Sequence, residues 1–233
     1  AILAVRGGRA SLRGRCADHA ARSILVTCEL LGACDGIGGC MARNQYGEPW
    51  TNDKTGILFV CHGNICRSTM AQFVMEELVR RAGCEGDFEI DSAATSREEL
   101  GNDVHPGTRE RLRRASIPCG HHAARQMGPR DYDRFDYIVG MDKDNYDGMY
   151  RLLLGERGMG FSWPPVSAQL VREADPLHKV SLLMDWTGHP RDVADPWYTG
   201  NFDATFDDVM AGCTAMLDKL LDKAKGKAED NVR

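Results

Sequence analysis

The sequence lacks several features that identify broad classes of protein. Its 233 residues contain no run of about 18 or more apolar residues, so we expect no segment that spans a membrane. Basic residues are not in excess: 29 Lys and Arg stand against 34 Asp and Glu, and the net charge of −5 argues against nucleic acid as a partner. The nine cysteines include no Cys-x2-Cys pair, so no metal site is indicated. What is left is a globular chain with 42% hydrophobic residues, enough for a packed core.

The cysteine number also bears on the cellular compartment. An odd count without the spacing of a small disulfide scaffold favours free thiols in a reducing compartment, and we expect the cytoplasm. The sequence gives no indication of oligomeric state.

Residues 1–54 differ in composition from the rest of the chain. Five arginines in the first 22 residues face a single acidic residue, Asp18, and no apolar periodicity is present. We expect an extension that is disordered or misassigned, with Met41 as the true start. The alternative is an organelle transit peptide, which shares the Arg-rich, acid-poor composition.

From residue 56 onward, short apolar runs alternate with helical patterns, which predicts βαβ units around a parallel sheet. The expected strands are residues 57–60, 88–91, 137–140 and 180–183. Ser68 is the expected N-cap of a first helix that ends before Gly83, and Pro106 opens a second helix that ends before Pro118. An apolar stripe over residues 206–224 predicts the closing helix.

The predicted fold is therefore an α/β domain with a four-stranded parallel sheet, helices on both faces, and a phosphate loop between the first strand and the first helix. The domain is expected over residues 55–225, with an insertion at residues 155–176 and a tail at residues 226–233.

The most informative segment is residues 61–69, Cys-His-Gly-Asn-Ile-Cys-Arg-Ser-Thr, between the first strand and the first helix. Cys61 at the start of the loop, Arg67 after five intervening residues and a helix N-terminus bring backbone N–H groups and a guanidinium to one point beside a sulfur. This arrangement suits a tetrahedral dianion, and its positive field favours a reactive thiolate. The segment predicts phosphoryl transfer through a cysteinyl-phosphate, without a metal or an organic cofactor.

Several segments match one family in order. The loop follows the pattern Val-Cys-x5-Arg-Ser, and the other matching segments are residues 91–96, 122–126, 135–142 and the Asp-Pro-Trp-Tyr of residues 195–198. Together they resemble the low-molecular-weight protein tyrosine phosphatases of the bacterial type, over about residues 55–221. The resemblance implies hydrolysis of phosphotyrosine, with phosphotyrosine-containing proteins as the expected partners.

Within the loop, Arg67 is the expected phosphate clamp, because its planar fork of donors matches two phosphate oxygens. Ser68 can donate a hydrogen bond to the Cys61 sulfur and stabilise it as a leaving group. Gly63 and Asn64 suit a loop whose N–H groups curl inward, since both tolerate positive φ.

Three further loop residues have expected places. His62 is expected at the rim, and Ile65 beside the aromatic ring of the substrate. Cys66 can be a small buried thiol. The resemblance suggests in addition a reversible disulfide with Cys61 that protects the nucleophile from over-oxidation.

Two residues outside the loop are assigned through the resemblance alone. In that family a Ser and a His hold the loop Asn, and Ser92 and His122 match their positions. An ordinary, hydrogen-bonded histidine is the alternative for His122.

A phenolate leaving group departs poorly without a proton, so a carboxylic acid must reach the phosphate from another loop. Asp195 is the candidate, because Pro196 stiffens its loop and Trp197 and Tyr198 can form the walls of a slot for an aromatic ring. In the resembled family this Asp is the general acid and then the base for water.

Three other functions share part of this pattern. A protein-arginine phosphatase uses the same scaffold, but its loop carries Thr where Ile65 stands. An arsenate reductase needs a downstream cysteine pair, whereas Cys84, Cys119 and Cys213 are too scattered. A phosphopeptide-binding module without turnover would lack the nucleophile or the acid, and both are present.

Overall fold

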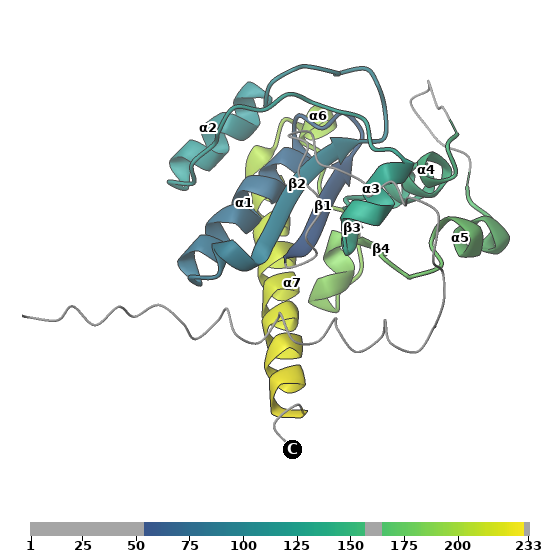
Figure 1. The fold of residues 1–233 in the computed structure, drawn as a ribbon. Coiled ribbons are helices and arrows are strands. Elements are labelled where there is room, and N and C mark those ends of the chain that lie inside the picture. Colours follow the sequence, from purple (N-terminus) through teal and green to yellow (C-terminus); the bar gives the residue numbers. More distant parts are fainter. Residues whose placement is uncertain (1–53, 157–164, 231–233) are drawn as a thin grey trace, which may run out of the picture.

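The computed structural model describes residues 54–156 and 165–230 (Figure 1). Nearly all of the expected N-terminal extension lies outside these residues, as do residues 157–164 of the expected insertion and the last three residues of the chain. Within the described residues, no helix combines the length and the apolar character that crossing a membrane requires.

A four-stranded parallel sheet forms the centre of the domain. Its strands are β1 (Thr55–Cys61), β2 (Phe88–Ala94), β3 (Tyr137–Gly140) and β4 (Val180–Leu182), in the order β2-β1-β3-β4. The predicted fold class is confirmed. β1 and β2 each extend beyond the expected bounds because the apolar or small residues that flank the predicted runs continue the ladder to Cys61 and Ala94.

The α-helices of the described residues are α1 (Arg67–Arg81), α2 (Pro106–Arg114), α3 (Pro129–Arg134), α4 (Lys143–Leu153), α5 (Ala168–Ala174), α6 (Pro196–Thr199) and α7 (Phe202–Asp230). Two short 3₁₀ turns are η1 (Glu85–Asp87) and η2 (Leu183–Thr187). The first two helices end where the glycine and proline signals predict, and Gly83 has the expected positive φ of 70°.

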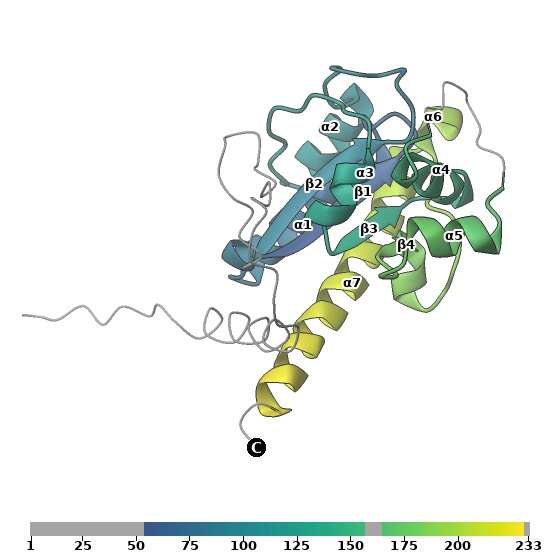
Figure 2. The ribbon, with the colours of Figure 1, turned by 45° about the vertical axis from the view of Figure 1, so that its right-hand side comes forward.

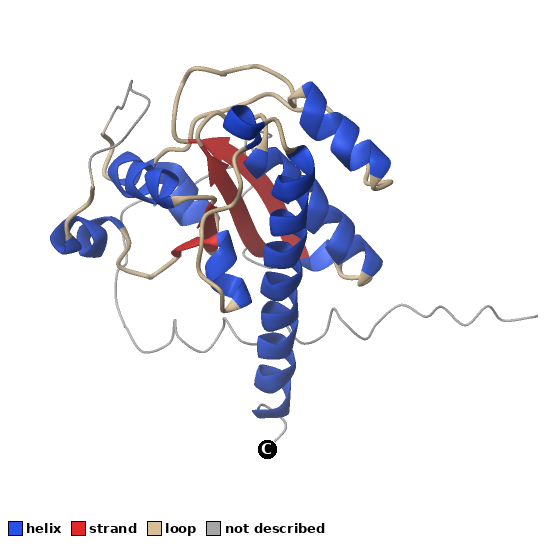
Figure 3. Ribbon diagram, turned by 180° about the vertical axis from the view of Figure 1, so that it is seen from behind, coloured by secondary structure: helices blue, strands red, loops and turns tan. Residues whose placement is uncertain are grey.

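Helices cover both faces of the sheet (Figures 1 and 2). Alternate residues of β1 point to opposite sides, as a strand requires. Ile57 and Phe59 belong to the buried cluster with α1 and α7, whereas Leu58 and Val60 belong to the cluster with α4. Figure 3 shows α7 running along one face of the sheet and extending past its lower end.

Two expectations about helix bounds were wrong. The N-cap of α1 is Cys66, not Ser68, because the Ser68 hydroxyl is committed to hydrogen bonds inside the loop and lies in the first turn. α7 begins at Phe202 and continues to Asp230, past the expected end near residue 224. The expected insertion at residues 155–176 contains a helix, α5. This helix packs beside α4 and buries Ala174.

Candidate active site

The candidate site lies where β1 ends. The connection after β1 leads to β2 on one side, whereas the connection after the adjacent strand β3 leads to β4 on the other, so a crevice opens between the carboxyl ends of β1 and β3. Cys61 is the last residue of β1, and the loop after it leads directly into α1. Cys66, the N-cap of α1, makes no side-chain capping hydrogen bond, so the positive end of a 15-residue helix faces this crevice.

The Cys61 sulfur is buried and is contacted by two polar groups of its own loop. The backbone N–H of Asn64 donates to it at 3.3 Å, and the Ser68 hydroxyl lies 3.1 Å away. Both contacts favour negative charge on the sulfur when the hydroxyl is the donor.

Asn64 determines which way the Ser68 hydroxyl points. The backbone N–H of Arg125 donates to Asn64 Oδ1 at 3.1 Å, and because a backbone N–H can only donate, this contact fixes the orientation of the amide. Asn64 Nδ2 then donates to Ser68 Oγ at 3.0 Å and to Ser92 Oγ at 2.8 Å. Ser68 accepts from the amide and keeps its own proton for the Cys61 sulfur.

Two further contacts hold this arrangement from behind. Ser92 donates to Gln72 Oε1 at 2.7 Å, and His122 Nε2 lies 2.8 Å from the backbone oxygen of Asn64. Because a carbonyl oxygen can only accept, Nε2 is the donor in this contact, and burial lowers the pKa of His122. Asn64 itself is fully buried with a φ of 58°.

Asn64 and Gly63 were both expected to suit the loop because they tolerate positive φ, and Asn64 alone of the two adopts it. Among the described residues, Asn64 is in the left-handed region and Gly63 is not. A Cβ atom at Gly63 would lie 3.0 Å from Cγ of Glu99. A larger residue at position 63 would therefore require the Glu99 side chain to shift.

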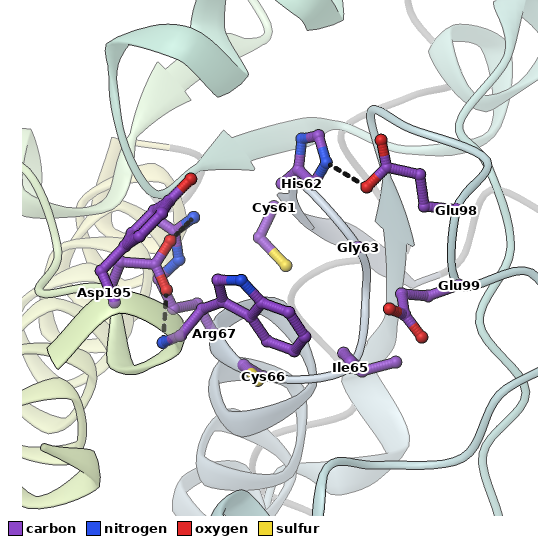
Figure 4. Close-up of a pocket in the computed structure, with 11 residues that line it drawn as sticks. Cys61, His62, Gly63, Ile65, Cys66, Arg67, Glu98, Glu99 and Asp195 are labelled. Carbon is purple, nitrogen blue, oxygen red and sulfur yellow. Dashed lines mark hydrogen bonds and ion pairs between the residues drawn. The ribbon is translucent and has the colours of Figure 1, made fainter. Parts of the chain in front are cut away.

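Arg67 is a buried cation held between two carboxylates. Its Nη1 donates to Asp142, which follows β3, and its Nη2 lies 2.6 Å from Oδ2 of Asp195. Burial lowers the pKa of Arg67, but electrostatic interaction with the Cys61 sulfur and with the two carboxylates raises it above its ordinary value. The guanidinium therefore stays charged, and Figure 4 shows it beside Asp195 in the pocket that Cys61 also lines.

Asp195 is placed by α6, a single turn. It is the N-cap of that helix: its Oδ1 accepts from the Trp197 backbone N–H at 2.9 Å while its Oδ2 contacts Arg67. Trp197 and Tyr198 follow on the same turn and remain largely exposed. His105 contacts the edge of the Trp197 ring and stacks on Phe202, which supports this wall of the pocket.

The pocket at this place brings together most of the predicted site residues. Its lining consists of Cys61, His62, Gly63, Ile65, Cys66, Arg67, Glu98, Glu99, Asp195, Trp197 and Tyr198. Asn64 and Ser68 belong to the same segment but are fully buried and do not line the pocket, and Ser92 and His122 contact Asn64 from behind. Burial, and next the nearby Cys61, raise the pKa of Cys66 to about 12, so Cys66 is a neutral thiol.

Five residues that the structure places here were not predicted from the sequence: Gln72, Glu98, Glu99, Arg125 and Asp142. Asp142, Glu98 and Glu99 could have been found, because they follow β3 and β2 and carboxyl ends of parallel strands meet at one edge. Gln72 and Arg125 carry no such signal.

Comparisons with known proteins agree with this geometry. The family model described as low molecular weight phosphotyrosine protein phosphatase matches residues 56–158. The low molecular weight protein-tyrosine-phosphatase YfkJ of Bacillus subtilis is 37% identical over 161 residues, covering 69% of this chain and 92% of that protein. The crystal structure of YfkJ aligns with a TM-score of 0.62 at 32% identity, covering 73% of this chain and 96% of that one. The Drosophila arginine phosphatase DARP has the same fold, with a TM-score of 0.55 at 24% identity over 70% of this chain and 96% of its own.

Proposed function

Since this chain belongs to the low molecular weight protein-tyrosine-phosphatase family, a family of hydrolases, we propose that it hydrolyses phosphotyrosine in proteins through a cysteinyl-phosphate on Cys61. One observation carries the assignment of roles. The 2.6 Å contact between Arg67 Nη2 and Asp195 Oδ2 joins a phosphate clamp and a proton donor in the pocket that Cys61 lines.

The first step transfers the phosphoryl group to the enzyme. The phosphate oxygens bind the N–H groups at the start of α1 and the fork of Arg67, and the Cys61 sulfur forms a bond to phosphorus as the bond to the tyrosine oxygen breaks. Asp195 gives a proton to that oxygen. A dianion beside Asp195 favours the protonated carboxyl that this step needs, because two negative groups at short range repel each other.

The second step returns the enzyme to its starting state. Asp195, now a carboxylate, takes a proton from water, and the water oxygen forms a bond to phosphorus while the sulfur–phosphorus bond breaks. The electron pair returns to Cys61, where the Ser68 hydroxyl and the Asn64 N–H stabilise the thiolate.

The two carboxylates on Arg67 have different parts in this mechanism. Asp142 Oδ1 accepts from the backbone N–H of Asn145 at 2.7 Å at the start of α4, an 11-residue helix packed in the core, so Asp142 stays and orients the guanidinium. Asp195 lies on a single helical turn with an exposed surface. We expect the incoming phosphate to replace the Arg67–Asp195 contact.

Protein-arginine phosphatase activity is the alternative on the same scaffold. Ile65 lines the pocket, and its branched apolar side chain favours an aryl group over a guanidinium. We therefore expect Ile65→Thr to narrow the preference for phosphotyrosine over phosphoarginine.

Initial rates on phosphotyrosine and phosphoarginine peptides, measured side by side with and without a chelator, test the proposal. We expect phosphotyrosine to be the better substrate and the chelator to change nothing. Cys61→Ser should abolish turnover while the protein still binds vanadate, because the anion cradle consists of backbone amides and Arg67. Faster hydrolysis of phosphoarginine would replace the proposal with the alternative.

We also propose that the protein acts in the cytoplasm. The described cysteines, Cys61, Cys66, Cys84, Cys119 and Cys213, are all free thiols, and a cysteine nucleophile needs a reducing compartment to stay active.

A further inference from the structure

Two glutamates form one wall of the pocket mouth. Glu98 and Glu99 line the pocket on the side opposite Asp195 and Arg67 (Figure 4). They belong to the loop after β2, at residues 95–102, and neither has a part in the chemistry proposed above. At the mouth they can meet only the parts of a substrate that lie outside the phosphate loop.

Hydrogen bonds fix this loop at both ends. The backbone N–H of Thr95 donates to the Cys61 oxygen at 2.8 Å, and that of Ser96 donates to the His62 oxygen at 3.0 Å. At the other end, Gly101 donates to the oxygen of Ala124 at 2.8 Å, and Ala124 donates to that of Asn102 at 2.8 Å. The loop therefore keeps its position relative to the phosphate loop.

The two carboxylates are themselves held in place. His62 Nε2 lies 3.0 Å from Oε2 of Glu98, and Asn102 Nδ2 donates to Oε2 of Glu99 at 2.6 Å. Glu99 also passes over Gly63, where a Cβ atom would meet its Cγ at 3.0 Å. The glutamates are thus oriented before a substrate arrives, which lowers the entropy cost of binding one.

The pocket lining contains more acidic than basic side chains. Glu98, Glu99 and Asp195 carry negative charge, and Arg67 is the cation among the lining residues. Arg67 lies deep in the pocket and is already paired with Asp142 and Asp195. Arg97 is the neighbour of Glu98 in sequence but is not part of the lining. The mouth of the pocket is therefore acidic, whereas the bottom of the pocket carries the positive charge of Arg67.

We propose that this acidic wall selects phosphotyrosines that have Lys or Arg within about two residues of them in the substrate. The inference rests on the proposed function. In a bound substrate the phosphate occupies the bottom of the pocket at Cys61 and Arg67, and the tyrosine ring extends past Ile65 and Trp197. The substrate residues next to the phosphotyrosine then lie near Glu98 and Glu99. A basic side chain there gains two oriented carboxylates, whereas an acidic one meets like charge.

Matched phosphotyrosine peptides that differ only in their flanking residues, basic, neutral or acidic, test the proposal through kcat/KM. Each exposed ion pair is expected to contribute about 1.4–5-fold, so with two carboxylates the basic peptide should exceed the acidic one by about 2–25-fold. The ratio should shrink as salt is raised, because the Debye length falls from about 10 Å at 0.1 M to about 3 Å at 1 M.

The double variant Glu98→Gln/Glu99→Gln should bring the ratio of basic to acidic peptide close to one. The matched control is Glu110→Gln/Glu173→Gln, which removes two exposed charges that do not line the pocket and should keep the parent ratio. The inference fails if the basic-to-acidic ratio is the same in the two double variants, or if the parent enzyme shows no preference between the peptides. Either result leaves the proposed phosphotyrosine phosphatase function standing. If no phosphotyrosine peptide is hydrolysed and phosphoarginine is, the proposed function fails as well.

Discussion

Asn64 offers a direct test of how the phosphate loop is held. Its side chain makes three hydrogen bonds, to Ser68, Ser92 and the Arg125 backbone, in a fully buried position. At about 1 kcal/mol for each bond, Asn64→Gly should lower the free energy of unfolding by about 3 kcal/mol. Asn64→Ala should cost roughly 1 kcal/mol more, because alanine is strained at a φ of 58° and glycine is not.

Thermal and urea unfolding measure these differences. For a domain of this size we expect Tm to fall by about 6–12 °C in Asn64→Gly. The control is Asn201→Ala, which removes one capping hydrogen bond to Ala204 on an exposed residue and should cost only about 1 kcal/mol.

The two Asn64 variants, but not the Asn201 control, should also lose activity, because the Ser68 hydroxyl loses the partner that directs its proton to Cys61. A misplacement of about 1 Å in a catalytic group costs on the order of 10²-fold, so kcat should fall by a similar factor at temperatures where the variants are folded. A glycine variant with the parent Tm and kcat would refute the role of this network, and equal loss in the glycine and alanine variants would refute the backbone argument.

Four other changes have defined outcomes. Asp195→Asn should slow a phenyl phosphate with a high-pKa leaving group by about 10²–10⁴-fold and a nitrophenyl phosphate less in the burst phase, whereas equal slowing would place the proton donor elsewhere. Peroxide should inactivate the enzyme reversibly through a Cys61–Cys66 disulfide, and full thiol rescue of treated Cys66→Ala would contradict this protection. Burial lowers the pKa of His122, so below about pH 6.5 the unfolded chain takes up a proton that folded His122 does not. The free energy of unfolding should therefore decrease as the pH falls below about 6.5. If His122→Gln shows the same pH dependence of the free energy of unfolding as the parent protein, His122 is not its cause. Deletion of residues 1–50 should leave kcat and Tm nearly unchanged, because no apolar periodicity there predicts packing on the domain, and a large loss of either would show the opposite.

The fold could be predicted from local patterns because β1 and β3 are short apolar runs and β2 begins with alternating apolar and acidic residues, Phe88 to Asp91, each beside a turn or a helix signal. α4 was nevertheless missed, although Asp142 is a good N-cap and Tyr146, Met149, Tyr150 and Leu153 recur at helical spacing. Asp147 and Gly148 interrupt the apolar pattern, yet both are buried. A polar residue on a buried face is satisfied by contacts that periodicity does not describe.

The candidate site divides in the same way between local and distant information. Nine consecutive residues contain the proposed nucleophile, the proposed phosphate clamp and the helix N-terminus, so this part of the proposed chemistry can be predicted from the sequence alone. Ser68 marks the limit of such inference: a hydroxyl at a helix start is typical of a cap, but in the folded protein Asn64 donates to it and its proton is left for the Cys61 sulfur. That choice depends on the Arg125 backbone, 61 positions away in the sequence, which fixes the amide of Asn64. The sequence therefore predicts which groups perform the chemistry, while their hydrogen-bond directions depend on contacts that only the folded sheet creates.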